Sequence, residues 1–108
     1  IIHCIKGSIV DVCVDVRRSS QFYNQPLSIK LKENSNLAVY VPKGFAHGFL
    51  SLEDDTIVQY MADKEHNPFK DKGILWNSID YKWECNNPIL SNRDLSHPSI
   101  GDQECIFF

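Results

Sequence analysis

Few side chains in this sequence are suited to chemistry, and His47 is the most informative of them. It follows a corner at Pro42-Lys-Gly44, where the proline ends strand pairing and the glycine can adopt a positive φ. The backbone therefore determines where the ring points. Two interpretations of His47 follow. It is either a core histidine that hydrogen bonds to a backbone carbonyl, or a metal ligand in the mouth of a barrel.

The other candidates are Tyr60, Asp71, Arg93 and Asp94. Tyr60 stands in a strand-like run, where a tyrosine usually packs in the core with its hydroxyl at the rim. Asp94 fits a turn or a helix cap, while Asp71 and Arg93 fit a charged surface. Each of these residues, taken alone, is compatible with an ordinary structural role.

A metal site at His47 would need more ligands than the neighbouring strands offer. The Pro-x-Gly-x-x-His pattern of residues 42–47 resembles the second motif of cupins. Cupin metal sites also take a His-x-His pair and a carboxylate from an earlier strand, so that three or four ligands converge. The earlier strands here contain a single histidine, His3. We therefore predict that His47 binds no metal.

Composition limits the class of protein. The 108 residues suffice for one domain, and 43% of them are hydrophobic, which is enough for a core. A net charge of −3 without a Lys/Arg run argues against a nucleic-acid partner. No apolar run approaches the roughly 20 residues of a membrane span. The four cysteines form no Cys-x-x-Cys pair, so we expect reduced thiols in a cytoplasmic protein.

Several runs within the first 61 residues alternate with a period of two, which is typical of strands with one buried face, and the polar stretch Arg17–Gln25 between two of them is predicted to be a loop. We predict a hairpin in which Ile1–Ile5 pairs with Ile9–Val16 through a turn at Lys6–Ser8. A further strand is expected over Leu27–Leu31. The next three strands should then form an antiparallel meander; they are Leu37–Val41, His47–Leu52 and Thr56–Met61.

The remaining chain is less regular. Gly73–Trp76 is predicted to be a short strand, and Ile79–Trp83 is either a strand or an irregular aromatic segment. Ser91 fits the cap of one helical turn that reaches Asp94. Many short, closely spaced strands predict an all-β fold, with a jelly-roll barrel of antiparallel strands as the natural architecture. The residues expected to face the core include Val10, Val12, Val39, Val41 and Leu50.

Four segments together resemble one family. Gly7–Arg17, Val41–Leu50, Tyr60 and Pro88–Asp94 match dTDP-4-dehydrorhamnose 3,5-epimerase in order and spacing over nearly the whole chain. The resemblance implies a single cupin jelly-roll domain over residues 1–108, without a metal or other cofactor, in a protein that forms homodimers. It implies epimerisation at C3 and C5 of a dTDP-linked 4-keto-6-deoxy sugar, on the route to dTDP-L-rhamnose.

The resemblance also implies roles for particular residues. Tyr60 matches the family's acid, and Asp94 matches the aspartate that pairs with the base histidine. His47 matches a ring that contacts the substrate. Asp71 stands where the family has a glutamate in the nucleotide site, and Arg93 stands where it has a basic residue.

The sequence departs from the family in what it lacks. The base histidine of the family lies in an upstream Arg-Gly-Leu-His segment, which this sequence does not contain, and a phosphate-binding arginine and a lysine are missing too. The chain opens at Ile1 inside an apolar run. We therefore expect it to be the C-terminal two-thirds of a longer epimerase, with the base in the missing part.

Two alternatives to the 3,5-epimerase remain open. One is a cupin that binds a sugar nucleotide without turnover. The other is a related keto-sugar isomerase or 5-epimerase that acts at one carbon. His66 would mark such a change, because it falls where the family usually has a second active-site tyrosine.

Overall fold

The computed structural model describes residues 1–62, 73–85 and 87–101. Its elements are five strands and one short helix: β1 (Ile2–Lys6), β2 (Ser8–Asp15), β3 (Pro26–Lys32), β4 (Phe45–Ser51), β5 (Ile57–Tyr60) and α1 (Asn92–Leu95). All five strands lie within a few residues of a predicted strand. None of the helical segments in the described part of the chain has the length and hydropathy of a membrane span.

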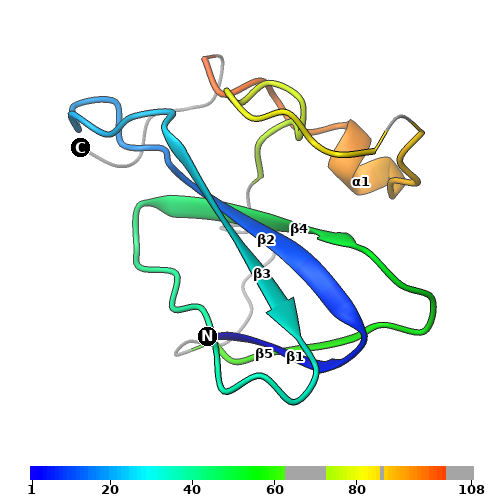
Figure 1. Cartoon of the computed structure of the whole chain (residues 1–108). Coiled ribbons are helices and arrows are strands. Elements are labelled where there is room, and N and C mark those ends of the chain that lie inside the picture. Colours follow the sequence, from blue (N-terminus) through cyan, green and yellow to red (C-terminus); the bar gives the residue numbers. More distant parts are fainter. Residues whose placement is uncertain (63–72, 86, 102–108) are drawn as a thin grey trace.

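The strands form two antiparallel sheets. One sheet pairs β1 with β5, and the other has the order β3-β2-β4. Figure 1 shows the β1–β5 sheet below the three-stranded sheet, with the C-terminal segment and α1 above it. The predicted all-β class with antiparallel strands is therefore confirmed.

The space between the sheets holds the main core. Ile2 and Cys4 from β1 pack there with Ile9 from β2 and Leu31 from β3, and we call the side of each sheet that carries these residues its inner face. A second cluster lies on the outer face of the three-stranded sheet. It consists of Val14, Val16 and Ile100, with Tyr23, Ala46, Ile74 and Ile79 packed against it. Strand β2 is thus buried on both faces.

The predicted core residues are buried to different degrees. Val12 is buried, and Val39 and Val41 are partly buried against the inner cluster. Val10 and Leu50, which are partners in the register of β2 and β4, are also partly buried.

The predicted hairpin of the first two strands is wrong. β1 pairs with β5, whereas β2 pairs with β3 and β4. Gly7, at φ 80°, turns the chain from one sheet to the other, and the side chain of Thr56 fills the space that a Cβ at Gly7 would need. The backbone N–H of Gly7 donates to Glu33 Oε2 at 3.0 Å. A glycine turn fits a corner between sheets as well as a hairpin, because both need a positive φ.

The predicted meander is also wrong. β4 and β5 follow each other in the chain but belong to different sheets. The expected strand over Leu37–Val41 reduces to one bridge, in which Val39 and Ile2 exchange backbone hydrogen bonds of 2.7 and 2.9 Å. The alternation there correctly indicates that Val39 and Val41 face the core, where they are partly buried, but burial on one side does not require a ladder partner at every residue.

The C-terminal segment is irregular. The predicted strand over Gly73–Trp76 is wrong, and Ile79–Trp83 takes the irregular alternative. Tyr81 and Trp83 meet edge to face, and the Trp83 indole N–H donates to the Trp76 carbonyl at 3.0 Å. The predicted cap is confirmed, since Ser91 Oγ accepts from the Asp94 backbone N–H. This segment covers the outer face of β2 through Ile74, Ile79 and Ile100.

Candidate functional site

His47 lies on the inner face of β4, beside a buried carboxylate. It is opposite Cys13 in the register of β4 and β2, and alternation puts both on the same side as Ile9. Nδ1 of His47 lies 3.4 Å from Oδ1 of Asp11, whose side chain is 0% exposed, while the His47 side chain is 36% exposed. Asp11 therefore holds the His47 ring on its Nδ1 side, and the rest of the ring is partly exposed on the inner face.

Asp11 is a residue that sequence reasoning missed. Its second oxygen, Oδ2, accepts from the Cys13 thiol at 3.8 Å. Burial and the nearby charge of Asp11 raise the pKa of Cys13 to about 11, so the thiol stays protonated at neutral pH. The sequence carried no signal of this burial, because Asp11 and Asp15 alternate with the valines of β2 and so occupy the positions expected to face solvent.

The surroundings of His47 on the inner face are apolar and open. Phe49 and Ile29 stand opposite Asp11 on the two neighbouring strands, and Leu27 stands opposite Cys13. These three apolar side chains are all exposed. Such a surface can exclude water from a bound ring, which strengthens the few polar contacts made there.

Tyr60 faces the same interior from the other sheet. It stands opposite Ile2 in the register of β1 and β5, and Ile2 belongs to the inner core. Its side chain is 73% exposed, and its hydroxyl has no hydrogen-bond partner among the described residues. The hydroxyl is therefore available to a molecule bound between the sheets.

Asp94 and Arg93 lie in α1, in the segment that covers the outer face. Oδ1 of Asp94 is 3.8 Å from Nε2 of His97, and the Asp94 side chain is 56% exposed. A Cβ at Gly73 would overlap the His97 ring, so the glycine makes room for it. Figure 1 shows α1 on the opposite side of β4 from β1 and β5. Within the described residues, no hydrogen bond or ion pair joins the Asp94 side chain to His47 or Tyr60.

Asp71, the predicted nucleotide-site residue, lies outside the described residues, and so does His66. Cys4, Cys13 and Cys85 are free thiols. In the described ranges, no group of three His, Cys, Asp or Glu side chains is placed to hold a metal ion. The absence of a metal at His47 remains a prediction.

The corner before β4 is held by an ion pair. Nε and Nη2 of Arg17 donate to the two oxygens of the buried Asp15 at 2.9 and 2.8 Å. The Arg17 side chain occupies the space where a Cβ at Gly44 would lie, and its guanidinium sits 5.3 Å from the centre of the Phe45 ring. Glycine is therefore needed at position 44 for two reasons: its φ of 91° is unfavourable for other residues, and the Arg17 side chain leaves no room for a Cβ. This contact fixes the start of the strand that carries His47.

We expect Asp15→Asn to destabilise the protein at neutral pH and to weaken its acid sensitivity. The Arg17 guanidinium hydrogen-bonded to Asp15 holds the pKa of that carboxyl well below its usual range. The stability it supplies is present above the unfolded pKa of about 3.9 and is lost as pH falls toward the folded pKa. The variant should lose about 2 kcal/mol of unfolding free energy at pH 7, and its stability should fall less between about pH 5 and pH 2.

The measurement is urea unfolding followed by tryptophan fluorescence at several pH values. Asp54→Asn is the matched control, because Asp54 is exposed in the turn before β5 and its loss should change little. If the unfolding free energies of wild type and Asp15→Asn fall equally as pH is lowered, Asp15 is not the source of the acid sensitivity.

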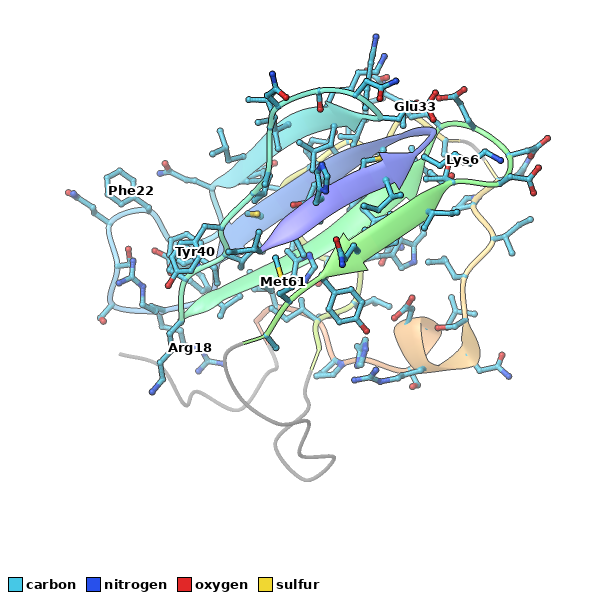
Figure 2. The ribbon with its side chains drawn as sticks, turned by 90° about the horizontal axis from the view of Figure 1, so that it is seen from below. Lys6, Arg18, Phe22, Glu33, Tyr40 and Met61 are labelled. Carbon is cyan, nitrogen blue, oxygen red and sulfur yellow. The ribbon has the colours of Figure 1, made fainter. Side chains whose placement is uncertain are left out.

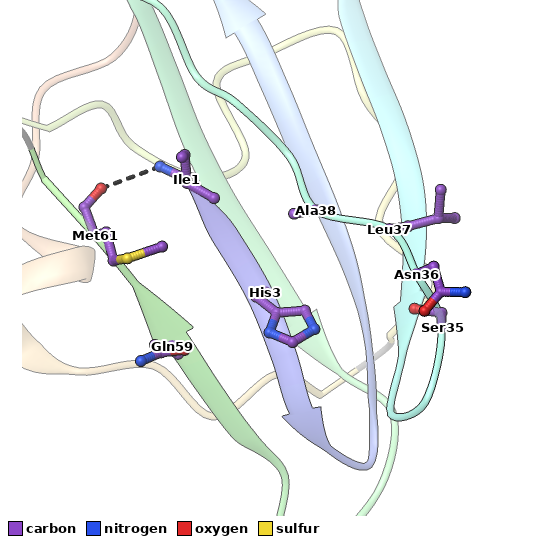
Figure 3. A pocket seen from close by; sticks show the side chains of 8 residues that line it. All are labelled: Ile1, His3, Ser35, Asn36, Leu37, Ala38, Gln59 and Met61. Carbon is purple, nitrogen blue, oxygen red and sulfur yellow. Dashed lines mark hydrogen bonds between the residues drawn. The ribbon is translucent and has the colours of Figure 1, made fainter.

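A hollow of about 350 Å³ lies on the outer face of the β1–β5 sheet, away from this interior. Figure 3 shows His3 between Gln59 and the Ser35–Ala38 segment, with the N-terminal amine of Ile1 bonded to the carbonyl of Met61. By alternation, His3 and Gln59 point away from the side that carries Ile2 and Tyr60. The hollow is therefore separate from the His47 site.

The chain is similar to known proteins of one family. The family profile described as dTDP-4-dehydrorhamnose 3,5-epimerase matches residues 1–102. A curated dTDP-4-dehydrorhamnose 3,5-epimerase of Shigella flexneri is 31% identical over 106 residues, which cover 96% of this chain and 59% of the relative. The chain spans just over half the length of the curated relatives it matches.

Solved structures share the fold. The dTDP-4-dehydrorhamnose 3,5-epimerase of Bacillus anthracis, with TDP and PPi bound, superposes with a TM-score of 0.86 at 38% identity, covering 91% of this chain and 57% of that one. ChmJ of Streptomyces bikiniensis, a 3'-monoepimerase in complex with dTDP-quinovose, gives 0.84 at 30% identity, covering 93% and 52%. These likenesses confirm the expected cupin-type jelly roll. With the profile match over almost its whole length, the chain belongs to the dTDP-4-dehydrorhamnose 3,5-epimerase family.

Proposed function

We propose that this protein is the C-terminal part of an isomerase that epimerises C3 and C5 of dTDP-4-dehydro-6-deoxy-D-glucose, in the biosynthesis of dTDP-L-rhamnose. One observation carries the proposal: His47 and Tyr60, which match family site positions, face one interior from opposite sheets. Residues 1–108 form its single cupin domain, its location is cytoplasmic, and its chemistry needs no cofactor.

The reaction needs two proton-transfer groups on opposite faces of the sugar. The C4 ketone makes the protons on C3 and C5 acidic, because it stabilises the enolate that their removal forms. A base removes a proton from one face, and an acid returns it to the other with inverted configuration. Tyr60 is the proposed acid, His47 contacts the sugar, and Asp94 orients the base. Asp71 and Arg93 bind the nucleotide end.

The base is expected in the part of the parent protein that contains the family's Arg-Gly-Leu-His segment. The test is solvent-deuterium exchange at C3 and C5 of dTDP-4-keto-6-deoxyglucose. The intact parent should exchange both positions. The 108-residue chain alone should exchange them about 10²–10⁴-fold more slowly than the Bacillus anthracis enzyme, because it lacks general-base catalysis. Exchange by this chain at a comparable rate would place the base within these residues.

A second candidate function is epimerisation at one carbon. It is favoured by His66, which stands where the family usually has a second active-site tyrosine, and by the likeness to a 3'-monoepimerase. The same assay separates the candidates. Exchange at a single carbon by the intact parent supports a monoepimerase, whereas ligand binding without exchange at either carbon supports a binding module.

The intact parent is further proposed to be a homodimer that uses the outer face of the β1–β5 sheet. This face exposes a set of large apolar side chains: Ile1, Ile5, Leu37, Ile57 and Met61. The outer face of the other sheet, by contrast, is covered by the C-terminal segment. A large apolar patch exposed on a sheet marks an interaction surface. In a two-fold dimer, the same patch of a second copy would cover it.

We expect Ile57→Glu in the intact parent to raise the dimer dissociation constant at least about tenfold, since a buried isoleucine contributes about 1.5–3 kcal/mol. Ile89→Glu is the matched control, because Ile89 is fully exposed on the C-terminal segment. Sedimentation equilibrium measures both. A monomeric wild type, or equal dissociation by the two variants, would contradict this interface.

A further inference from the structure

Asp11 is a buried carboxylate whose neighbours define what it can do. Its side chain is 0% exposed, and a buried charge is costly unless hydrogen bonds compensate it. In the described part of the chain, each of its oxygens has one side-chain partner: Oδ1 meets His47 Nδ1 at 3.4 Å, and Oδ2 accepts from Cys13 Sγ at 3.8 Å. The separation from Nδ1 is longer than a usual N–H···O bond.

The two partners differ in strength. A thiol is a weak hydrogen-bond donor, and the Cys13 thiol remains protonated at neutral pH. An imidazole N–H is a strong donor, and a hydrogen bond to a carboxylate is stronger than one to a neutral acceptor. The compensation of the Asp11 charge therefore depends mainly on His47. It requires a proton on Nδ1, because a bare Nδ1 lone pair would face the carboxylate and repel it.

We infer that Asp11 is a positioning residue that holds His47 in the Nδ1–H tautomer, with Nε2 presented to the interior as the atom that meets a bound sugar. A neutral Nε2 accepts a hydrogen bond, so the ligand group opposite it is a hydroxyl of the sugar. Which nitrogen of a histidine carries the proton is set by the partner of the other nitrogen. The ligand assignment rests on the proposed function, whereas the tautomer does not.

The geometry of β2 and β4 explains why the pair is rigid. Asp11 and His47 come from neighbouring strands in one ladder, where seven consecutive residue pairs run from Ile9–Ser51 to Asp15–Phe45. The Arg17–Asp15 pair closes the end of this ladder at Phe45. Both side chains therefore stand on rigid backbone, and a ring placed in this way needs little ordering when a ligand binds.

The test is the tautomer of His47 in the 108-residue chain, read from long-range ¹H–¹⁵N NMR spectra at a pH where the ring is neutral. The expected result is a proton on Nδ1 and a lone pair on Nε2, the reverse of the usual preference of a free imidazole. His3 is the internal reference, because its ring has no side-chain partner among the described residues. Nε2–H as the main form of His47 would overturn the inference.

Two variants sharpen the test. Asp11→Asn should lower the ratio of Nδ1–H to Nε2–H at His47 by about tenfold, because an amide can present either an oxygen or an NH₂ group to the ring. Asp54→Asn removes the same charge from an exposed turn and should leave the ratio unchanged. An unchanged ratio in folded Asp11→Asn would overturn the inference. If Asp11→Asn does not fold, the wild-type tautomer still decides.

A functional readout separates this inference from the proposed reaction. In the intact parent, Asp11→Asn should raise KM for the 4-keto sugar nucleotide about tenfold with a smaller change in kcat, since His47 contacts the sugar and Tyr60 transfers the proton. The Nδ1–H tautomer in a parent without turnover would uphold Asp11 and refute the reaction. The Nε2–H tautomer in an active parent would refute the role of Asp11 and uphold the reaction.

Discussion

Tyr60→Phe in the intact parent is expected to lower the rate of epimerised product formation by about 10²–10⁴-fold. The substitution removes the hydroxyl that returns a proton to the sugar and leaves the ring in place. That hydroxyl faces the interior and has no hydrogen-bond partner within the described ranges, so its loss leaves no buried group unsatisfied and should hardly change stability.

Deuterium exchange distinguishes an acid from a merely supporting residue. If Tyr60 is the acid, the base on the other face can still remove a proton and return one to the face it left. Exchange should then fall much less than inversion. Tyr40→Phe is the control, since Tyr40 is 74% exposed, close to the 73% of Tyr60, and lies at the end of the sheets near Phe22 in Figure 2. A parallel fall in exchange and inversion would assign Tyr60 another role.

Asp94→Asn in the intact parent is the second large effect, with an expected loss of about 10²–10⁴-fold in kcat. An aspartate that pairs with the base imidazole fixes its tautomer and stabilises its cation. Asparagine keeps the shape of the side chain but supplies no charge. The exposed carboxylate of Asp94 pairs with His97 at 3.8 Å, so its present partner must be tested as well.

His97→Gln and Asp80→Asn complete the Asp94 experiment. Asp94 is also the third residue after the Ser91 cap, where an acidic side chain adds about 0.3–1 kcal/mol to a helix. If Asp94 only supports α1, Asp94→Asn will lower the melting temperature slightly and leave kcat near wild type. If Asp94 acts through His97, Asp94→Asn and His97→Gln will lower kcat equally. Asp80→Asn, at an exposed site of the same segment, should change neither the melting temperature nor kcat.

Alternation predicted strands well because it reports a local property. β2 and β3 lie where Ile9–Val16 and Leu27–Leu31 were expected, and Val39 and Val41 are partly buried against the core although their predicted strand reduces to one bridge. A side chain that alternates between core and solvent leaves a period of two in the sequence whichever strand it pairs with. Ser91 likewise indicates its cap, since capping involves only residues three apart.

The candidate site was predictable only where a motif was present. His47 and Tyr60 could be named from the family resemblance, but Asp11 could not. An aspartate that alternates with valines along a strand is expected to face solvent. That face became an interior only when the β1–β5 sheet packed against it. Asp15 is also buried, next to its ion-pair partner Arg17, whose side chain stays 37% exposed.

The sequence by itself determined the all-β class, most of the strands, the helix cap and the family. Only the tertiary structure decided which strands are neighbours. It pairs Ile2 with Tyr60 instead of closing a hairpin at Gly7, and it separates β4 from β5. The physical reason is that strand pairing is a long-range choice: every edge offers the same backbone donors and acceptors. The choice is made by burying Ile2, Cys4, Ile9 and Leu31 together, which no local pattern encodes.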